Sequence, residues 1–163
     1  MKISQEPQEN YYLKLKMIGL LLITLLVAAA AFDVKSLNGT VASSTCGGNC
    51  PGGCNECPCG TSKQSESASS WCSKYSGWDQ KSCECIMNHE SGANAHAANM
   101  NTDSSYDVGL WQINDQNWAS CSGGKAPCSG NDNLNCAKKV FGWGGNTWKL
   151  WSTCSICGVC NSK

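Results

Sequence analysis

The chain has 163 residues, enough for one folded domain with additional segments. Twelve basic and 12 acidic residues give a formal net charge of zero, and every basic residue is Lys, which argues against a nucleic-acid-binding protein. Fourteen cysteines predict a disulfide framework formed in an oxidising compartment.

An apolar run near the N-terminus, Met17 to Phe32, predicts a secretory signal peptide. Two lysines precede the run and four alanines lie near its end, as in such signals. It is shorter than the ~20 residues that a membrane-spanning helix needs. We therefore expect residues 1–32 to be a leader with a signal peptide, cleaved between Ala30 and Asp33, and no stable membrane association afterwards. Translation starts at Met1 or Met17, and an uncleaved anchor or a buried helix is the alternative.

Two segments of low hydrophobicity follow the leader. Residues 33–45 form a polar linker in which Asn38-Gly-Thr is a glycosylation acceptor on the secretory route; an unmodified linker is the alternative. Residues 61–70 are rich in serine, which predicts a flexible linker or a frayed helix start.

Between these segments, residues 46–60 form a cysteine-rich knot. Five cysteines with Gly and Pro leave little to bury, so disulfides must hold any fold here. Because five is odd, at least one cysteine must pair outside the knot. A metal cluster with Cys57 and Cys59 as ligands is the alternative, and the knot is either a separate binding element or a spacer.

The remaining residues, 71–163, predict one α+β domain. Two helices are expected between Trp71 and Glu90, broken at residues 77–79, and a small antiparallel sheet over residues 99–114. Further helices are expected over residues 135–141, stopped at Gly142, and over residues 146–153.

Two carboxylates lie in different local settings within this domain. Glu90 is expected at the end of a helix, where the helix dipole disfavours negative charge, and Asp107 precedes the strand expected at residues 108–114. Glycosidic bond hydrolysis uses such an unequal pair. In the alternative interpretation Glu90 is a surface acid and Asp107 a strand cap, with Asp103 as its competitor for the catalytic role.

Five motifs in chain order carry a resemblance to a known family. They are C-x4-E-S from Cys85, A-x-N-x-N-T-D-S-S from Ala97, D-x-G-L-x-Q-I-N from Asp107, N-C-A-K-K-V from Asn135 and W-x-x-W-x-x-C from Trp148. Together they resemble the chicken-type (c-type) lysozymes, glycoside hydrolases of bacterial peptidoglycan. The resemblance implies a lysozyme-like α+β fold with a mainly helical lobe and a small antiparallel sheet.

The resemblance also implies roles for single residues. Glu90 corresponds to the general acid and Asp107 to the nucleophile or charge-stabilising carboxylate. Trp148 corresponds to the indole against which the general acid packs, whereas Trp111 and Trp151 are expected in the core. The other substrate-binding positions are Asn101, Gln112, Asn114 and Trp118.

Disulfide pairing follows from the same resemblance. It implies disulfides between Cys85 and Cys154 and between Cys121 and Cys128. Cys136 then needs another partner, for which Cys83 is the candidate. The tail cysteines, Cys154, Cys157 and Cys160, have no counterpart in the family and are expected to pair with Cys72 or with the knot.

The expected function is that of a secreted muramidase, antibacterial or digestive, that cleaves β-1,4 bonds between N-acetylmuramic acid and N-acetylglucosamine. A lytic transglycosylase and a non-catalytic glycan-binding protein are the alternatives. The expected partner is peptidoglycan or chitooligosaccharide, and the protein is expected to be a monomer, secreted or in a lysosome-like or phagosome-like vacuole. No cofactor or metal is expected, and a metal pair of His89 and His96 is the alternative.

Overall fold

The computed structural model describes residues 46–48, 50 and 53–163. These residues belong to a single compact unit. The predicted signal peptide and the acceptor Asn38 lie outside them. Among the described residues, no helix is long and apolar enough to cross a membrane.

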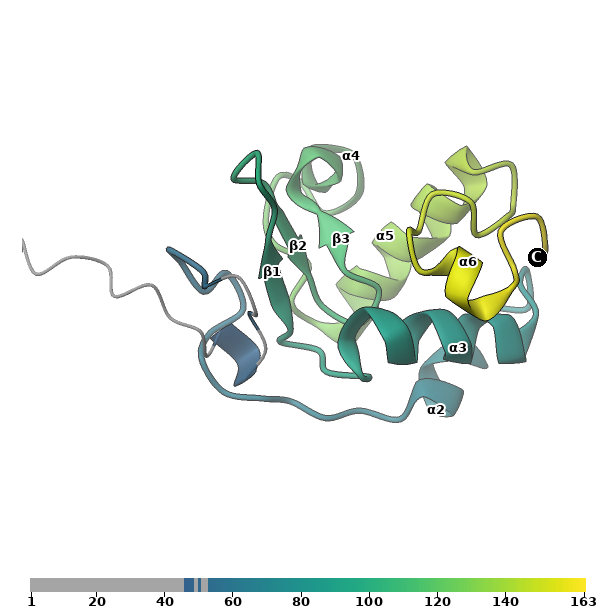
Figure 1. Ribbon diagram of the computed structural model, residues 1–163, viewed down its shortest axis with the longest axis horizontal. Helices are drawn as coiled ribbons and strands as arrows, with labels where there is room; N and C mark the ends of the chain where they lie inside the picture. The colour runs from purple at the N-terminus through teal and green to yellow at the C-terminus, as the bar shows by residue number, and fades with distance from the viewer. Residues whose placement is uncertain (1–45, 49, 51–52) are drawn as a thin grey trace, which may run out of the picture. The chain divides into compact units, whose positions relative to one another are not determined.

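The first two α-helices confirm the predicted break at residues 77–79. Helix α2 spans Ala68–Cys72 and α3 spans Gln80–Ser91 (Figure 1). Asp79 caps the start of α3, where its Oδ1 accepts a hydrogen bond of 2.8 Å from the backbone N–H of Ser82. Gly92 ends α3 in the left-handed conformation, at φ 60°.

The predicted antiparallel sheet is confirmed, with three short strands in sequence order (Figure 1). They are β1 (Ala98–Met100), β2 (Tyr106–Val108) and β3 (Ile113–Asn114). The continuous strand predicted at residues 108–114 is wrong, because residues 109–112 form turns and Asp107 lies within a strand rather than before one. Asp107 of β2 pairs with Asn99 of β1 on one side and Asn114 of β3 on the other. Because side chains alternate between the faces of a sheet, these three polar residues share one face, and Ala98 and Val108 share the opposite face.

The remaining described residues after the sheet are helical or irregular, and one predicted helix is wrong. The elements are the 3₁₀ helix η2 (Asp115–Asn117), α4 (Trp118–Cys121), α5 (Gly130–Trp143) and α6 (Cys154–Cys157). Helix α5 continues through Gly142 to Trp143. Residues 146–153 then form turns and bends rather than the predicted helix, and the left-handed backbone of Asn146, at φ 59°, is incompatible with a helix start there.

An aromatic core holds the helices together. Trp78 lies 5.2 Å from Trp148 and 5.7 Å from Phe141 between ring centroids, and Trp148 lies 5.0 Å from Trp151. Trp111 and Trp148 are fully buried. Because each aromatic ring buries a large apolar area, this cluster stabilises the helical part of the domain.

The cysteine-rich knot packs against the sheet rather than standing apart. It contains the 3₁₀ turn η1 (Cys46–Gly48). Its buried cysteines, Cys46, Cys50, Cys54 and Cys59, form one cluster with Ala98 of β1 and Val108 of β2. A Cβ atom on Gly47 would lie 1.8 Å from the carbonyl oxygen of His96, so only glycine permits this close approach. The knot therefore covers the sheet face opposite Asp107.

The serine-rich segment, predicted as a linker, is tied to the domain by backbone hydrogen bonds. The N–H of Ala95 donates to the carbonyl of Gln64 (2.8 Å), and the N–H of Glu66 donates to the carbonyl of Ala93 (2.8 Å). Ser67 caps α2. Ordered structure thus extends well before Trp71, where the domain was expected to begin.

All 14 cysteines are paired, and the pairing differs from the prediction. The disulfides are Cys46–Cys57, Cys50–Cys54, Cys59–Cys128, Cys72–Cys83, Cys85–Cys157, Cys121–Cys136 and Cys154–Cys160. The odd cysteine of the knot pairs outside it, as predicted. The pairings Cys85–Cys154, Cys121–Cys128 and Cys136–Cys83 are wrong, as are pairings of the tail with Cys72 or the knot.

Local geometry explains these corrections. The turn of α6 brings Cys157, not Cys154, within 5.9 Å of Cys85 between Cα atoms. Cys154 instead closes a short loop with Cys160. Cys128 is taken by Cys59 of the knot, so Cys121 of α4 reaches Cys136 on α5.

Candidate active site

One pocket brings the two predicted catalytic carboxylates together. Its lining combines polar side chains with apolar ones, from Glu90, Asp107, Gln112, Ile113, Asn114, Asn117, Val140, Leu150, Trp151 and Ser152. The polar side comes largely from the sheet and η2, and the apolar side from α5 and residues 150–151. An open pocket of this kind suits a ligand with both hydroxyl groups and apolar faces, such as a sugar.

Glu90 occupies the drier of the two carboxylate environments. It lies one residue before the end of α3, and the hydroxyl of Thr153 donates a hydrogen bond to its Oε1. Burial raises the pKa of Glu90 above its ordinary value; hydrogen bonds from Thr153 oppose that rise, and the negative charge of Asp107 adds to it. The net effect favours the protonated form, as a general acid requires.

Asp107 is held by amide groups on both of its oxygens. Asn101 Nδ2 donates to Oδ2 at 2.9 Å, and Asn114 Nδ2 donates to Oδ1 at 2.9 Å. Each amide also donates to Ser105 Oγ at 3.0 Å. These donors fix the carboxylate plane and satisfy its negative charge, so Asp107 presents a fixed anion to the pocket.

Gln112 lies in the pocket wall in a strained conformation. Its φ is 47°, in the left-handed region that non-glycine residues seldom adopt. Its Nε2 donates to the carbonyls of Gly109 (2.9 Å) and Ala97 (3.2 Å). Strain of this kind persists where the surroundings determine it, and here it sets the turn between β2 and β3.

Asn133 of α5 is a structural anchor of this turn that sequence reasoning missed. It is fully buried, its Oδ1 accepts from the N–H of Trp111, and its Nδ2 donates to the carbonyls of Val108 and Pro127, each at 2.9 Å. A Cβ on Gly109 would lie 2.1 Å from the Asn133 amide. The signal was the polar residue at a core position of an amphipathic helix.

Trp111 and Trp151 are buried in the core, as predicted. Trp151 lines the pocket, and its indole N–H donates to the carbonyl of Trp111 at 2.8 Å. Trp148 is fully buried and is not among the lining residues. Trp118 is partly buried and donates from its indole N–H to the carbonyl of Ile113 at 3.0 Å, while its neighbour Asn117 reaches the pocket.

Thr153, Leu150 and Asn117 are further site residues that sequence reasoning missed. Their neighbours Trp118 and Trp151 carried recognisable motif positions, but small polar and aliphatic residues in irregular segments leave no periodic signal. Leu150 is 52% exposed although it lines the pocket.

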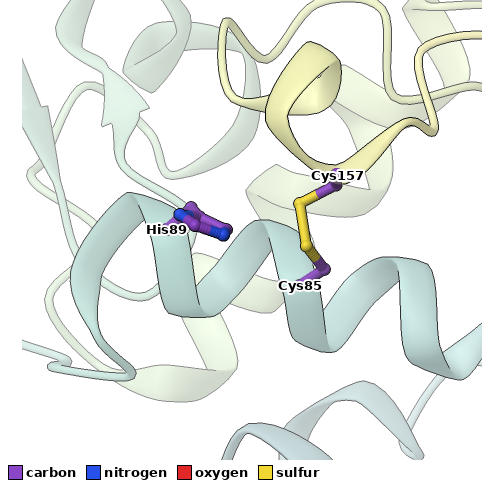
Figure 2. A group of neighbouring side chains, drawn as sticks. All are labelled: Cys85, His89 and Cys157. Carbon is purple, nitrogen blue, oxygen red and sulfur yellow. A yellow bond between two sulfur atoms is a disulfide. The ribbon is translucent and has the colours of Figure 1, made fainter.

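One trio of metal-ligating residue types occurs in the part of the chain that the structure describes. Single ligand atoms of Cys85, His89 and Cys157 lie within 4.8 Å of one another. Figure 2 shows the two sulfur atoms bonded to each other, with the imidazole beside them. Because a metal needs thiolates, the disulfide leaves no ligand set here. His96 points elsewhere, with its Nδ1 3.0 Å from the carbonyl of Ser62.

Comparisons with known proteins agree with this fold and site. Residues 81–153 match a family model described as "Lysozyme like domain". The chain is 36% identical over 94 residues to Lysozyme C-1 of Anas platyrhynchos, a match that covers 47% of this chain and 63% of the duck protein. The chain thus spans less than two thirds of that relative's length.

The fold is of the α+β class, as predicted, and residues 81–153 are similar to a lysozyme-like domain. More particularly, the similarity to the duck Lysozyme C-1 agrees with the predicted resemblance to the c-type lysozymes.

Proposed function

We propose that this chain is a retaining glycoside hydrolase, a muramidase that cleaves the β-1,4 bond between N-acetylmuramic acid and N-acetylglucosamine in peptidoglycan. The observation that carries the proposal is the presence of two carboxylates with unequal surroundings in one pocket. Glu90 is half-buried and its pKa is raised, whereas both oxygens of Asp107 accept amide hydrogen bonds. Lysozyme is the standard example of such a division of roles.

In the first step Glu90 donates its proton to the glycosidic oxygen, and the bond to the leaving sugar breaks. Asp107 stabilises or captures the positive charge that develops at the anomeric carbon. Water then attacks that carbon from the side of the departed sugar, any bond between the carbon and Asp107 breaks to return the carboxylate, and Glu90 accepts the proton of the water. Retaining enzymes place their carboxyl groups about 5–5.5 Å apart, and both carboxyl groups here line the same pocket.

The proposed setting outside the catalytic step follows from the sequence. We propose a protein made with the signal peptide of residues 1–32, acting as a monomer outside the cell or in a digestive vacuole, in defence or in nutrition. Glycosylation at Asn38 and sugar contacts from Asn101, Gln112, Asn114 and Trp118 belong to the same proposal, whereas Trp148 is fully buried and makes no sugar contact. The pocket itself favours Asn117 and Trp151 as additional contacts.

Mass analysis of products from purified peptidoglycan tests the function. A hydrolase adds one water across each cleaved bond and releases muropeptides with reducing ends. Each product is heavier by one water than the corresponding anhydro product. Glu90→Gln keeps the shape but supplies no acidic proton, so we expect about a 10³-fold loss of rate. Anhydro-sugar ends would identify a lytic transglycosylase, and binding of chitooligosaccharide without cleavage a non-catalytic protein. Unchanged lysis by the Gln variant would remove Glu90 from the mechanism.

A further inference from the structure

The C-terminal tail lies beside the helix that carries Glu90. Helix α6 packs against α3 (Figure 1), and the disulfide Cys85–Cys157 joins them, as Figure 2 shows. Cys154 and Cys160 close the tail on itself through a second disulfide. The muramidase mechanism assigns no role to this pair of cross-links.

Thr153 is the residue that these cross-links hold in place. It directly precedes α6, and its carbonyl accepts the first backbone hydrogen bonds of that helix, from the N–H groups of Ile156 (3.1 Å) and Cys157 (3.2 Å). It lies between Cys154, which is disulfide-bonded, and Ser152 of the pocket wall. The backbone of Thr153 is therefore fixed on both sides.

The side chain of Thr153 points from this fixed backbone to the carboxyl group of Glu90. Its hydroxyl donates to Glu90 Oε1, a contact between residues 63 positions apart in sequence. The backbone N–H of Thr153 also acts on this carboxyl and lowers its pKa. A carboxyl with a partner on one oxygen has a defined orientation, and orientation of the acid toward the glycosidic oxygen is what proton transfer requires.

We propose that Thr153 is a positioning residue for Glu90, and that the disulfides Cys85–Cys157 and Cys154–Cys160 form a clamp that keeps its hydroxyl on the acid. The catalytic part of this inference rests on the proposed muramidase function. The clamp explains why the tail carries cysteines at every third position.

The direction in which Thr153 shifts the pKa of Glu90 follows from its two hydrogen-bond donors. Both Thr153 donors favour the ionised carboxylate and lower the pKa of Glu90, against burial, which raises it. Among the described residues, Asp107 of β2 is the charged group that acts on Glu90. The other elements around the pocket contribute the uncharged Val140, Leu150 and Trp151. Loss of the hydroxyl therefore raises the pKa further.

The test compares Thr153→Val, which keeps the shape without a donor, with Thr153→Ser, which keeps the donor. On soluble peptidoglycan fragments, we expect kcat of the Val variant to fall about 10-fold or more with KM unchanged, and the alkaline limb of its pH profile to move to higher pH. The Ser variant should stay close to the parent protein. Thr153→Ala serves as a second donor-free variant if the Val variant does not fold.

A carboxyl NMR titration of Glu90 in the same proteins keeps the two proposals distinguishable. A higher titration midpoint in the Val variant, restored in the Ser variant, supports the contact whether or not the protein cleaves peptidoglycan. Absence of cleavage by the parent protein would end the muramidase proposal alone. Identical Glu90 titration, kcat and pH profiles in the parent and Val proteins would overturn the positioning role.

Discussion

The two walls of the pocket are built by different means. The wall that carries Glu90 rests on an aromatic core around Trp78 and Trp148 and on the cross-linked tail. The wall that carries Asp107 is a sheet of three short strands, backed by the cysteine-rich knot. Partial burial on the first wall raises the pKa of Glu90, whereas the second wall supplies amide hydrogen bonds to Asp107.

This difference shows how a small domain separates the chemistry of two identical functional groups. The buried aromatic rings pack against one another, and the indole N–H groups of Trp78 and Trp151 donate to backbone carbonyls. A strand of three residues buries too little surface to hold a fixed geometry alone, and the sheet here is tied by Cys59–Cys128 and by Asn133. The knot therefore supports the proposed catalytic geometry from the side opposite the pocket.

Removing the knot's external disulfide should have the largest effect on stability. Cys59–Cys128 closes a segment of 69 positions, so its replacement by two serines should lower the free energy of unfolding by about 4 kcal/mol in the chain-entropy description. Denaturant unfolding measures this change. The matched control replaces Cys154 and Cys160, 6 positions apart, for which the same description gives about 2 kcal/mol. Equal losses in both variants would contradict a bracing role for the knot.

Replacing Asp107 tests the polar wall directly. In Asp107→Asn, the new amide must place its NH₂ group against the amide donor of either Asn101 or Asn114, because each already donates to one carboxylate oxygen. Loss of charge at the reacting carbon should lower kcat about 10²-fold, which is about 2.7 kcal/mol. The matched control is Asp103→Asn, since Asp103 is exposed. A larger loss in the control would transfer the role to Asp103.

Several features of the two walls could be predicted from motifs in the sequence. The break predicted at residues 77–79 and the sheet predicted over residues 99–114 rest on local signals, so helix α3 and the sheet could be predicted. Glu90 and Asp107 were named from the same motifs, and the structure brings them into one pocket.

The predictions that were wrong or missing concern contacts between residues far apart in the sequence. Cys85 pairs with Cys157 rather than Cys154 because residues 146–153 turn instead of forming a helix and α6 follows them. The knot contains little apolar surface beyond its cysteines, so its burial against Ala98 and Val108 left no signal in its own sequence. The hydrogen bond from Thr153 to Glu90 joins residues 63 positions apart, so no local pattern in the sequence predicts it.

The titration of the Glu90 carboxyl, followed by NMR in the parent protein and in Asp107→Asn, tests the unequal pair most directly. Burial and the charge of Asp107 raise the pKa of Glu90, so the account predicts a midpoint above that of solvent-exposed glutamates and a lower midpoint in the Asn variant. The protonated acid then persists to a higher pH than an ordinary glutamic acid would allow, and activity should decline as pH rises through that midpoint. A midpoint at or below the ordinary glutamate value would contradict the assignment of Glu90 as the general acid.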